Sequence, residues 1–216
     1  MLTPEQIENL PPDTRKEYMQ TALLLNQKKK DQSVRDDFMS FVKYIWPEFI
    51  EGEHHKIMAD KFNKVASGEI KRLIINMAPR HTKSEFASNL LPAWMIGNNP
   101  KLKIIQATHN AELAVRFGRK AKTVIDSEDY QNIFNTRLRE DSKAAGKWET
   151  DQGGEYYAAG VGGSITGRGA DLMIIDDPHS EQDAMNQASF DRAWEWYTSG
   201  PRQRLQPGGR IILVMT

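Results

Sequence analysis

Two short apolar segments, each followed at once by polar groups, most constrain the fold of this chain. The first spans residues 73–77 and runs into a turn that contains a lysine and a serine. The second spans residues 172–175 and runs into two adjacent aspartates. Apolar runs of this length, bounded by turn residues, are typical of strands buried on both faces. We therefore expect a mainly parallel sheet that carries helices on both faces and presents polar groups at the carboxyl ends of its strands.

The rest of the chain fits this α/β pattern. Helix and strand patterns alternate from about residue 53 onward, without an internal repeat. The expected strands cover 71–77, 102–107, 171–176 and 210–216. The expected helices cover 54–66, 84–96, 111–125 and a segment with Trp194 and Trp196. A hairpin is expected between Trp148 and Tyr156, around a turn at 151–154.

The N-terminal residues predict a peripheral helical part. A helix with Asp13 as its N-cap is expected to reach the lysines at 28–30, and an amphipathic helix is expected over 35–45. We divide the chain into a helical arm or lid over residues 1–39 and an α/β domain over residues 40–216. The last segment reads as a buried strand at which the sequence stops, so we expect further protein downstream.

Composition limits the classes of function. The 216 residues suffice for one sizeable domain, and 29 Lys plus Arg balance 29 Asp plus Glu. Net charge therefore gives no argument for nucleic-acid binding, although a local basic face stays open. There is no cysteine, which excludes disulfides and thiolate chemistry. No apolar run approaches the roughly 20 residues that cross a bilayer, so we expect an intracellular protein without a membrane partner.

The turn after the first apolar segment resembles a phosphate-binding loop. The usual pattern is G-x-x-x-x-G-K-[ST], in which Lys83 and Ser84 fit while Met77 and Thr82 occupy the glycine positions. An ordinary Lys-Ser turn is the alternative reading of the pattern alone. The position after a strand and at the start of a helix favours anion binding. We expect Lys83 on the β- and γ-phosphates and the Ser84 hydroxyl on Mg²⁺.

Two neighbours extend this predicted loop. Arg80 and His81 place further donors within it and could compensate for the missing glycines.

The two adjacent aspartates complete the chemistry of a nucleotide site. In P-loop enzymes the first carboxylate holds Mg²⁺, usually through water, and the second orients the attacking water. We assign these roles to Asp176 and Asp177. A plain strand end followed by a turn is the alternative for either residue alone. Asp177 is one methylene shorter than the glutamate more often found there, so its reach to the water is an open question.

A glycine-rich loop at 160–169 precedes the acidic strand. Its glycines suggest a mobile or closely approached backbone, and Arg168 lies between two of them. Arg168 is our candidate for an arginine finger, which stabilises charge in the transition state. An exposed loop arginine is the alternative, and Arg137 and Arg139 are weaker candidates for the same role.

These motifs resemble those of the large terminase subunits of tailed bacteriophages. The similar strings are IINMAPRHTKSE at 74–85, ITGRGADLMIIDDP at 165–178 and IILVMT at 211–216, so the resemblance covers roughly residues 40–216. Each string is common, and the combination is specific. The resemblance implies a RecA-like P-loop ATPase domain of the ASCE type. Residues 80–85 match the family's nucleotide-binding segment, and the set that we expect around the nucleotide is Arg80, His81, Thr82, Lys83, Ser84, Glu85 and His55.

The resemblance also implies a role. The family hydrolyses ATP with Mg²⁺ to drive double-stranded DNA into a procapsid, working as a homo-oligomeric ring on the portal protein with a small terminase subunit. We expect a pentameric ring, a monomer in isolation, and a place in the host cytoplasm rather than in the mature virion. Arg168 matches an arginine that acts on a neighbouring subunit's ATP, and Thr216 falls in the family's coupling motif. The family's nuclease domain would follow residue 216, so we expect ATP hydrolysis but no DNA cleavage.

Three smaller features stay open in the sequence. His55, within a His-His-Lys run at the start of a helix, is a candidate for adenine contact or an ordinary helix-end histidine. The segment 108–110 follows the second strand and is either a sensor of phosphate or DNA, or a helix cap by Asn110. Trp194 and Trp196 are expected to pack or to face a partner.

Two other classes of function remain to be separated from a packaging motor. One is a helicase-type translocase lobe, which would need a second such lobe elsewhere in the protein. The other is a nucleotide-binding module without turnover, which has no need for two adjacent carboxylates.

Overall fold

The computed structural model describes residues 2–165 and 167–216. Thr166, in the predicted glycine-rich loop, lies outside the described residues. One sheet of seven strands forms the body, in the order β1-β7-β6-β2-β5-β4-β3. The strands are β1 (Arg72–Asn76), β2 (Lys103–Thr108), β3 (Leu138–Ala144), β4 (Lys147–Thr150), β5 (Glu155–Gly160), β6 (Ala170–Asp176) and β7 (Leu205–Met215).

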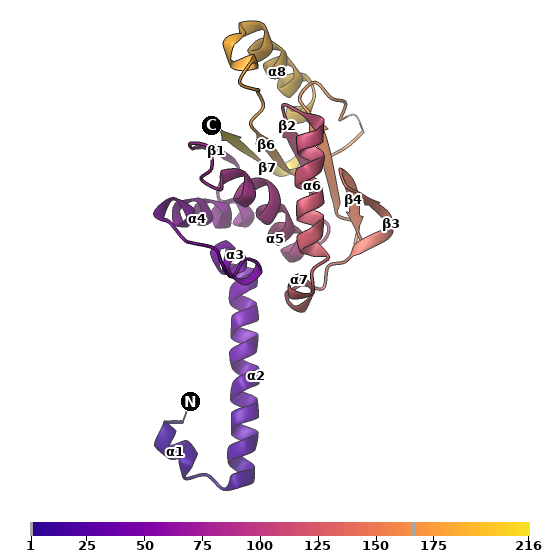
Figure 1. Cartoon of the computed structure of the whole chain (residues 1–216). Helices are drawn as coiled ribbons and strands as arrows, with labels where there is room; N and C mark the ends of the chain where they lie inside the picture. The colour runs from indigo at the N-terminus through magenta and orange to yellow at the C-terminus, as the bar shows by residue number, and fades with distance from the viewer. Residues whose placement is uncertain (1, 166) are drawn as a thin grey trace.

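Helices lie on both sides of this sheet and extend away from it (Figure 1). The α-helices are α1 (Pro4–Glu8), α2 (Pro12–Asp36), α3 (Phe38–Ile45), α4 (Glu53–Ser67), α5 (Leu91–Asn98), α6 (Ala111–Ile125), α7 (Glu128–Ile133) and α8 (Gln187–Ser199). A π-helix, η1 (Glu85–Leu90), and two 3₁₀ turns, η2 (Asp183–Met185) and η3 (Pro201–Arg204), complete the elements.

The pairing confirms the predicted sheet. Strands β1, β7, β6, β2 and β5 run parallel, β4 pairs antiparallel with β5, and β3 pairs antiparallel with β4 at the edge of the sheet. The predicted hairpin is the turn between β4 and β5, where Trp148 and Tyr156 stack with ring centroids 4.7 Å apart. Strand β3 was not expected, because its charged sequence LREDSKA lacks an apolar face. Such charge is typical of an edge strand, where it discourages pairing with other chains.

The main core lies between the sheet and the helices α3 to α7. Phe38, Phe41, Phe62 and Phe86 are completely buried there and pack on each other and on the sheet. On the opposite face α8 covers part of β6 and β7 through Trp196 and Tyr197. The sheet is thus flanked by helices on both faces, as predicted, although the second face is only partly covered.

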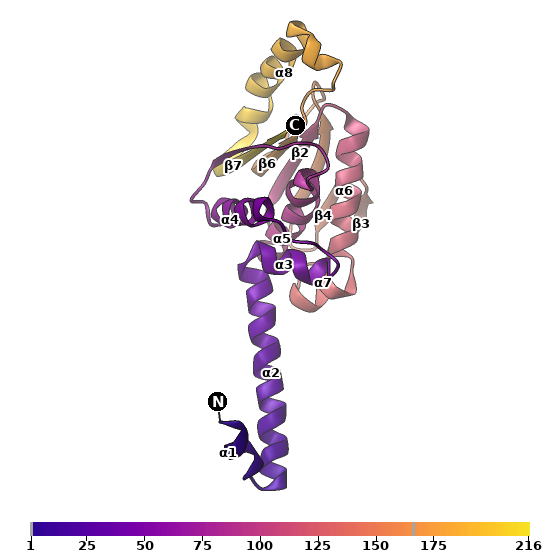
Figure 2. The same ribbon diagram turned by 60° about the vertical axis from the view of Figure 1, so that its left-hand side comes forward.

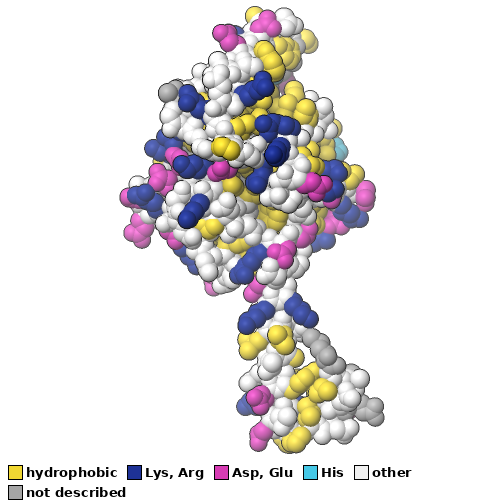
Figure 3. Space-filling view, turned by 180° about the vertical axis from the view of Figure 1, so that it is seen from behind, with side chains coloured by type: hydrophobic (Ala, Val, Ile, Leu, Met, Phe, Trp, Pro, Cys, Tyr) yellow, Lys and Arg dark blue, Asp and Glu magenta, His cyan; other side chains and the backbone are white. Residues whose placement is uncertain are grey.

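The arm is longer and more continuous than expected. The helix begins at Pro12, not after an N-cap at Asp13, and it runs to Asp36 rather than ending near residue 30. Proline suits the first turn of a helix, where its missing N–H is not needed. Figures 1 and 2 show α2 projecting away from the body. Figure 3 shows apolar side chains on the surface of the arm, and the exposed apolar residues of α2 are Met19, Leu23, Leu24 and Leu25.

Two further helices depart from their predicted limits. The helix predicted over 35–45 begins at Phe38, because Asp37 has an extended backbone and caps it by accepting from the Ser40 N–H at 2.7 Å. The predicted boundary between residues 39 and 40 therefore falls inside α3. The helix predicted over 84–96 opens as the π-helix η1 and becomes α-helical at Leu91. Pro92 has no N–H to donate, and its ring would press on the preceding turn, so the wider π turn relieves this conflict.

Candidate nucleotide site

The carboxyl ends of the parallel strands β1, β6 and β7 bring the predicted residues together. Lys83 lies in the turn after β1, Asp176 is the last residue of β6, and Asp177 and Thr216 directly follow β6 and β7. The Lys83 ammonium donates to the Thr216 hydroxyl at 2.7 Å and lies 3.7 Å from the Asp177 carboxylate. The side chains singled out from sequence therefore form one cluster.

Asp177 is held in place through both its carboxylate and its backbone carbonyl. Its carboxylate accepts from the backbone N–H of Thr216 at 3.0 Å. Its carbonyl accepts from the backbone N–H of His109 at 3.1 Å and from the His109 ring at 2.9 Å. His109 thus acts on this aspartate from the end of β2, and Asn110 caps α6 by accepting from the Glu112 N–H at 2.7 Å.

Asp176 lies deeper and is almost completely buried. Its two carboxylate oxygens accept from the Ser84 hydroxyl at 3.1 Å and from the Ser88 hydroxyl at 2.6 Å. Gln106 in turn donates to Ser88 at 3.1 Å. Burial raises the pKa of Asp176 above its usual range, the two serine hydroxyls lower it, nearby Asp177 raises it and Lys83 lowers it. The site thus holds a carboxylate that is poorly compensated when ionised.

Sequence reasoning did not find Ser88 or Gln106. Ser88 lies four residues after Ser84 in the same helical segment, and this spacing was a usable signal, because positions four apart meet on one helix face. Gln106 gave a weaker signal as a single polar residue within an apolar strand.

The turn between β1 and η1 has an unusual backbone. Arg80 has φ of 63° and Thr82 has φ of 59°, and Asp177 nearby has φ of 44°. Among the residues that the structure describes, these are the only non-glycine positions with positive φ. Left-handed backbone in such residues is uncommon and concentrates at functional sites.

A pocket of about 480 Å³ opens over this turn. Arg80 is exposed at its wall, and Lys83 is buried at its base. The pocket is lined by Trp46, Arg80, Thr82, Lys83, Ser84 and Glu85. Its size is within the usual range for a small-molecule site.

The remaining predicted loop residues have partners within the protein. His81 is exposed and its ring donates to the Pro79 carbonyl at 2.9 Å. Glu85 forms an ion pair with Lys120 of α6 at 2.7 Å. His55 is buried and contacts Thr82 rather than open space. Contact of His55 with adenine would require its ring nitrogens to change partners.

Arg168 lies at the other end of the sheet. It precedes β6 and forms an ion pair with Glu155, the first residue of β5. It therefore lies at the amino edge, the end of the sheet at which the parallel strands begin. Its guanidinium also stacks over the Tyr157 ring, 4.1 Å from the centroid. Arg137 donates to nearby backbone carbonyls and Arg139 pairs with Asp141 and Glu149. The structure therefore brings none of the three candidate arginines to Lys83 of its own subunit.

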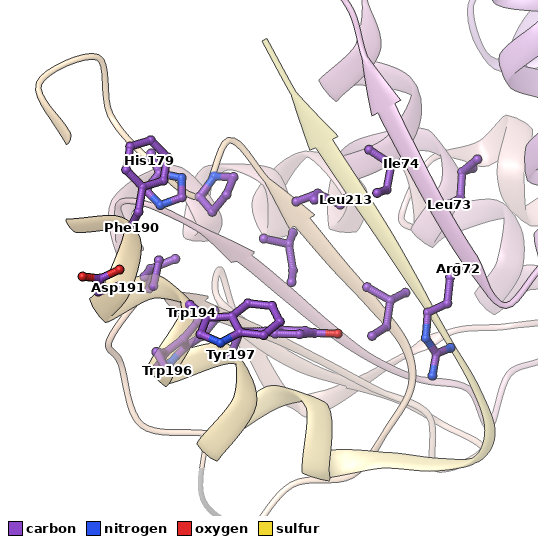
Figure 4. A pocket seen from close by; sticks show the side chains of 15 residues that line it. Arg72, Leu73, Ile74, His179, Phe190, Asp191, Trp194, Trp196, Tyr197 and Leu213 are labelled. Carbon is purple, nitrogen blue, oxygen red and sulfur yellow. The ribbon is translucent and has the colours of Figure 1, made fainter. Parts of the chain in front are cut away.

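A second pocket, of about 500 Å³, lies on the partly covered face of the sheet. In Figure 4 side chains of α8 face those of β1 and β7 across it. Ile74 on β1 is 65% exposed and Trp194 on α8 is 64% exposed, whereas Trp196 packs inward and donates to the Gly163 carbonyl at 3.0 Å. This pocket is apolar, and its lining includes none of Lys83, Asp177 and Thr216.

Comparisons with known proteins agree with the architecture. No family model matches the sequence. The chain is 23% identical over 165 residues to the terminase large subunit of Enterobacteria phage T3, which covers 74% of this chain and 28% of that protein. Its fold matches the crystal structure of the HK97 bacteriophage large terminase with a TM-score of 0.55 at 14% identity, over 84% of this chain and 37% of that one. The chain thus spans less than two-fifths of the length of each relative, and the resemblance to large terminase subunits is confirmed in sequence and in fold.

Proposed function

We propose that this relative of the large terminase subunits is a Mg²⁺-dependent ATPase that powers the movement of double-stranded viral DNA into a procapsid. The observation that carries the proposal is the convergence of Lys83, Asp176 and Asp177 from separate elements at one edge of the sheet. A cation, a buried carboxylate beside a hydroxyl, and a second carboxylate are the groups that phosphoryl transfer to water needs.

Lys83 binds the β- and γ-phosphates in this proposal. In the structure the Lys83 ammonium contacts the Thr216 hydroxyl and lies near the Asp177 carboxylate. A charged phosphate oxygen would take the place of these contacts through a charge-assisted hydrogen bond. A helical segment begins at Lys83, and the free N–H groups of a helix's first turn favour an anion. Arg80 lines the pocket and adds positive charge near the triphosphate. His81 lies in the exposed turn and adds a hydrogen-bond donor.

Ser84 and Asp176 fit a magnesium ion. Both offer oxygen, the ligand that Mg²⁺ prefers, and their oxygens are already 3.1 Å apart. No group of three or more His, Asp or Glu suited to a metal occurs among the described residues. Mg²⁺ commonly uses one or two protein ligands together with water and substrate phosphates. When bound, the ion neutralises charge on the phosphates and on the buried Asp176 carboxylate.

Asp177 orients the attacking water. Its carboxylate is about one-third exposed and lies beside Lys83, so it reaches the space where the γ-phosphate would end. Fixed hydrogen bonds from Thr216 hold one carboxylate oxygen and leave the other toward Lys83. Thr216 contacts both Lys83 and Asp177, which supports a coupling role for this residue between hydrolysis and the movement of β7.

Arg168 acts on a neighbouring subunit in the assembled ring. Its place at the amino edge of the sheet prevents action on its own nucleotide, and it must leave Glu155 to reach another. The ring, the portal protein, the small terminase subunit and double-stranded DNA are the proposed partners, in the host cytoplasm during assembly. A helicase-type lobe or a binding module without turnover would lack this dependence on neighbours.

The concentration dependence of hydrolysis tests the proposed ring. The ATP hydrolysis rate per subunit should rise with protein concentration, and Arg168→Ala should flatten the rise by removing a contribution worth roughly 10³-fold or more. Arg139→Ala tests one of the two weaker candidates for the finger, which lies in a surface ion pair, and we expect it to leave the curve unchanged. A rate that depends neither on concentration nor on Arg168 would exclude the trans-acting arginine.

A further inference from the structure

His55 connects the helix that precedes the sheet to the phosphate loop. It lies in the first turn of α4 and is only 6% exposed. One ring nitrogen, Nε2, is 2.5 Å from the Thr82 hydroxyl, and the other, Nδ1, accepts from the Gly52 N–H at 2.8 Å. The residues His55 and Thr82 are far apart in sequence, so this contact is tertiary and specific.

One set of proton positions satisfies every group in this chain of hydrogen bonds. Because the Gly52 N–H must donate, Nδ1 carries no proton, and the neutral ring then has its proton on Nε2. Nε2 therefore donates to the Thr82 hydroxyl, which donates onward to the His81 carbonyl at 2.7 Å. A protonated ring would place two donors against each other at Gly52.

Thr82 is the residue that needs such support. It occupies the position at which the usual phosphate loop has glycine, and its φ of 59° is left-handed. For a residue with a Cβ this conformation is unfavourable, and a β-branched side chain makes it rarer still. Lys83 follows directly, so the direction of its side chain depends on the backbone of Thr82.

We propose that His55 is a positioning residue of the phosphate loop, which holds Thr82 in the left-handed conformation that a glycine adopts unaided and so aims Lys83 at the nucleotide. The effect of His55 on ATP binding rests on the proposed function, whereas its effect on the conformation of the loop does not.

The surroundings of His55 favour a neutral ring. Phe49 and Phe86 pack against it with centroids 4.7 and 5.1 Å away. The titratable groups that face it are His54, His81 and Glu51. Burial lowers the pKa of His55, His54 and His81 lower it further, and Glu51 opposes them.

A double-mutant cycle separates positioning from packing. His55→Ala should weaken binding of a fluorescent ATP analogue about fivefold, the effect of one hydrogen bond of about 1 kcal/mol. In a Thr82→Gly background the same change should weaken binding less than about twofold, because glycine adopts the left-handed conformation without support. Equal losses in both backgrounds would assign His55 to packing alone and overturn the proposal.

Conservative variants supply the control. His55→Gln keeps an acceptor for Gly52 and a donor for Thr82, in the arrangement of a capping box, and should restore most of the affinity. His55→Leu fills the same space against Phe49 and Phe86 without a hydrogen bond and should behave like His55→Ala. Affinity restored by leucine and not by glutamine would contradict the proposal.

Thermal stability gives a readout that needs no nucleotide. His55→Ala should lower the melting temperature by about 2–4 °C in the wild-type loop, and by less than half of that in the Thr82→Gly loop. If the wild-type chain bound no ATP analogue, the proposed function would fail, and the stability cycle would still decide the role of His55. Additive shifts in melting temperature would overturn that role on their own.

Discussion

The residues of the site are held in conformations and environments that are unfavourable by themselves. Arg80, Thr82 and Asp177 have a left-handed backbone. Thr82 is stabilised by its contact with His55, and Asp177 by the backbone N–H of Thr216. Asp176 is buried, and its carboxylate accepts from the hydroxyls of Ser84 and Ser88. Such local costs, on the order of 1–3 kcal/mol for each strained residue, are typical of sites that must be ready to receive a ligand.

The residue types of the site could be predicted from sequence, but not their backbone or their supports. The Lys-Ser pair and the Asp-Asp pair each follow an apolar run, and this local pattern sufficed to place them at one sheet edge. The contact of His55 with Thr82 depends on how α4 packs beside the loop, which no local pattern encodes. The position of Arg168 beside Glu155 likewise follows from pairing of the sheet.

Asp176 should make stability depend on pH in the absence of metal. Its folded-state pKa is raised, so the folded protein binds more protons than the unfolded chain in the range just above the usual aspartate pKa of about 3.9. Stability from this group is therefore present at low pH and is lost as pH rises through the folded pKa. Asp176→Asn should raise the melting temperature by a few degrees at pH 8 in EDTA, and the gain should shrink toward pH 5.

Melting curves of wild type and Asp176→Asn between pH 5 and pH 8 check this prediction. Asp191→Asn, an exposed aspartate of α8, is the matched control and should show little shift. Addition of Mg²⁺ with ATP should stabilise the wild type more than Asp176→Asn. A destabilised Asp176→Asn protein at pH 8 would contradict this account of Asp176.

At the scale of elements, apolar patterning located the parallel strands and most helices. It was least informative where strand pairing, a proline or a helix cap sets the limits of an element. Strand β3 is polar and is set by its pairing with β4. The π-helix η1 arises from a proline one turn later, a conflict that periodicity does not report. The end of α2 is set by Asp37, whose side chain caps the next helix.

Helix α3 should contribute to the stability of the whole domain, although it follows the projecting arm directly. Phe38 is completely buried, and its ring lies 5.2 Å from Phe62 and 5.5 Å from both Phe86 and Trp94. Phe38→Ala should lower the free energy of unfolding by about 3–5 kcal/mol, because it leaves a cavity among these rings. Leu24→Ala in the exposed part of α2 should change it by less than about 0.5 kcal/mol.

Urea unfolding of both variants measures these free energies. A small effect of Phe38→Ala on the free energy of unfolding would mean that α3, like the arm, contributes little to the stability of the domain. A large effect of Leu24→Ala would mean that the arm packs on a surface that Figures 1 and 2 leave open.

At the scale of the whole molecule, the two ends of the parallel strands carry different groups. The carboxyl edge gathers Lys83, Asp176 and Asp177, and the amino edge carries Arg168. In the proposed function, this separation means that a subunit binds nucleotide by itself and depends on a neighbour for rapid turnover. No helix among the described residues has the length and apolar character needed to cross a membrane.

The measurement that tests the central claim most directly is steady-state ATP hydrolysis with Mg²⁺ by the wild type, Lys83→Ala and Asp177→Asn. Lys120→Ala serves as the control, since it removes another lysine near the loop, one that forms an ion pair with Glu85. We predict Mg²⁺-dependent turnover by the wild type and by Lys120→Ala, loss of activity in Lys83→Ala, and at least about a hundredfold lower rate in Asp177→Asn. Turnover that survives in Lys83→Ala, or its absence from the wild type at every protein concentration, would contradict the assignment of this site as an ATPase.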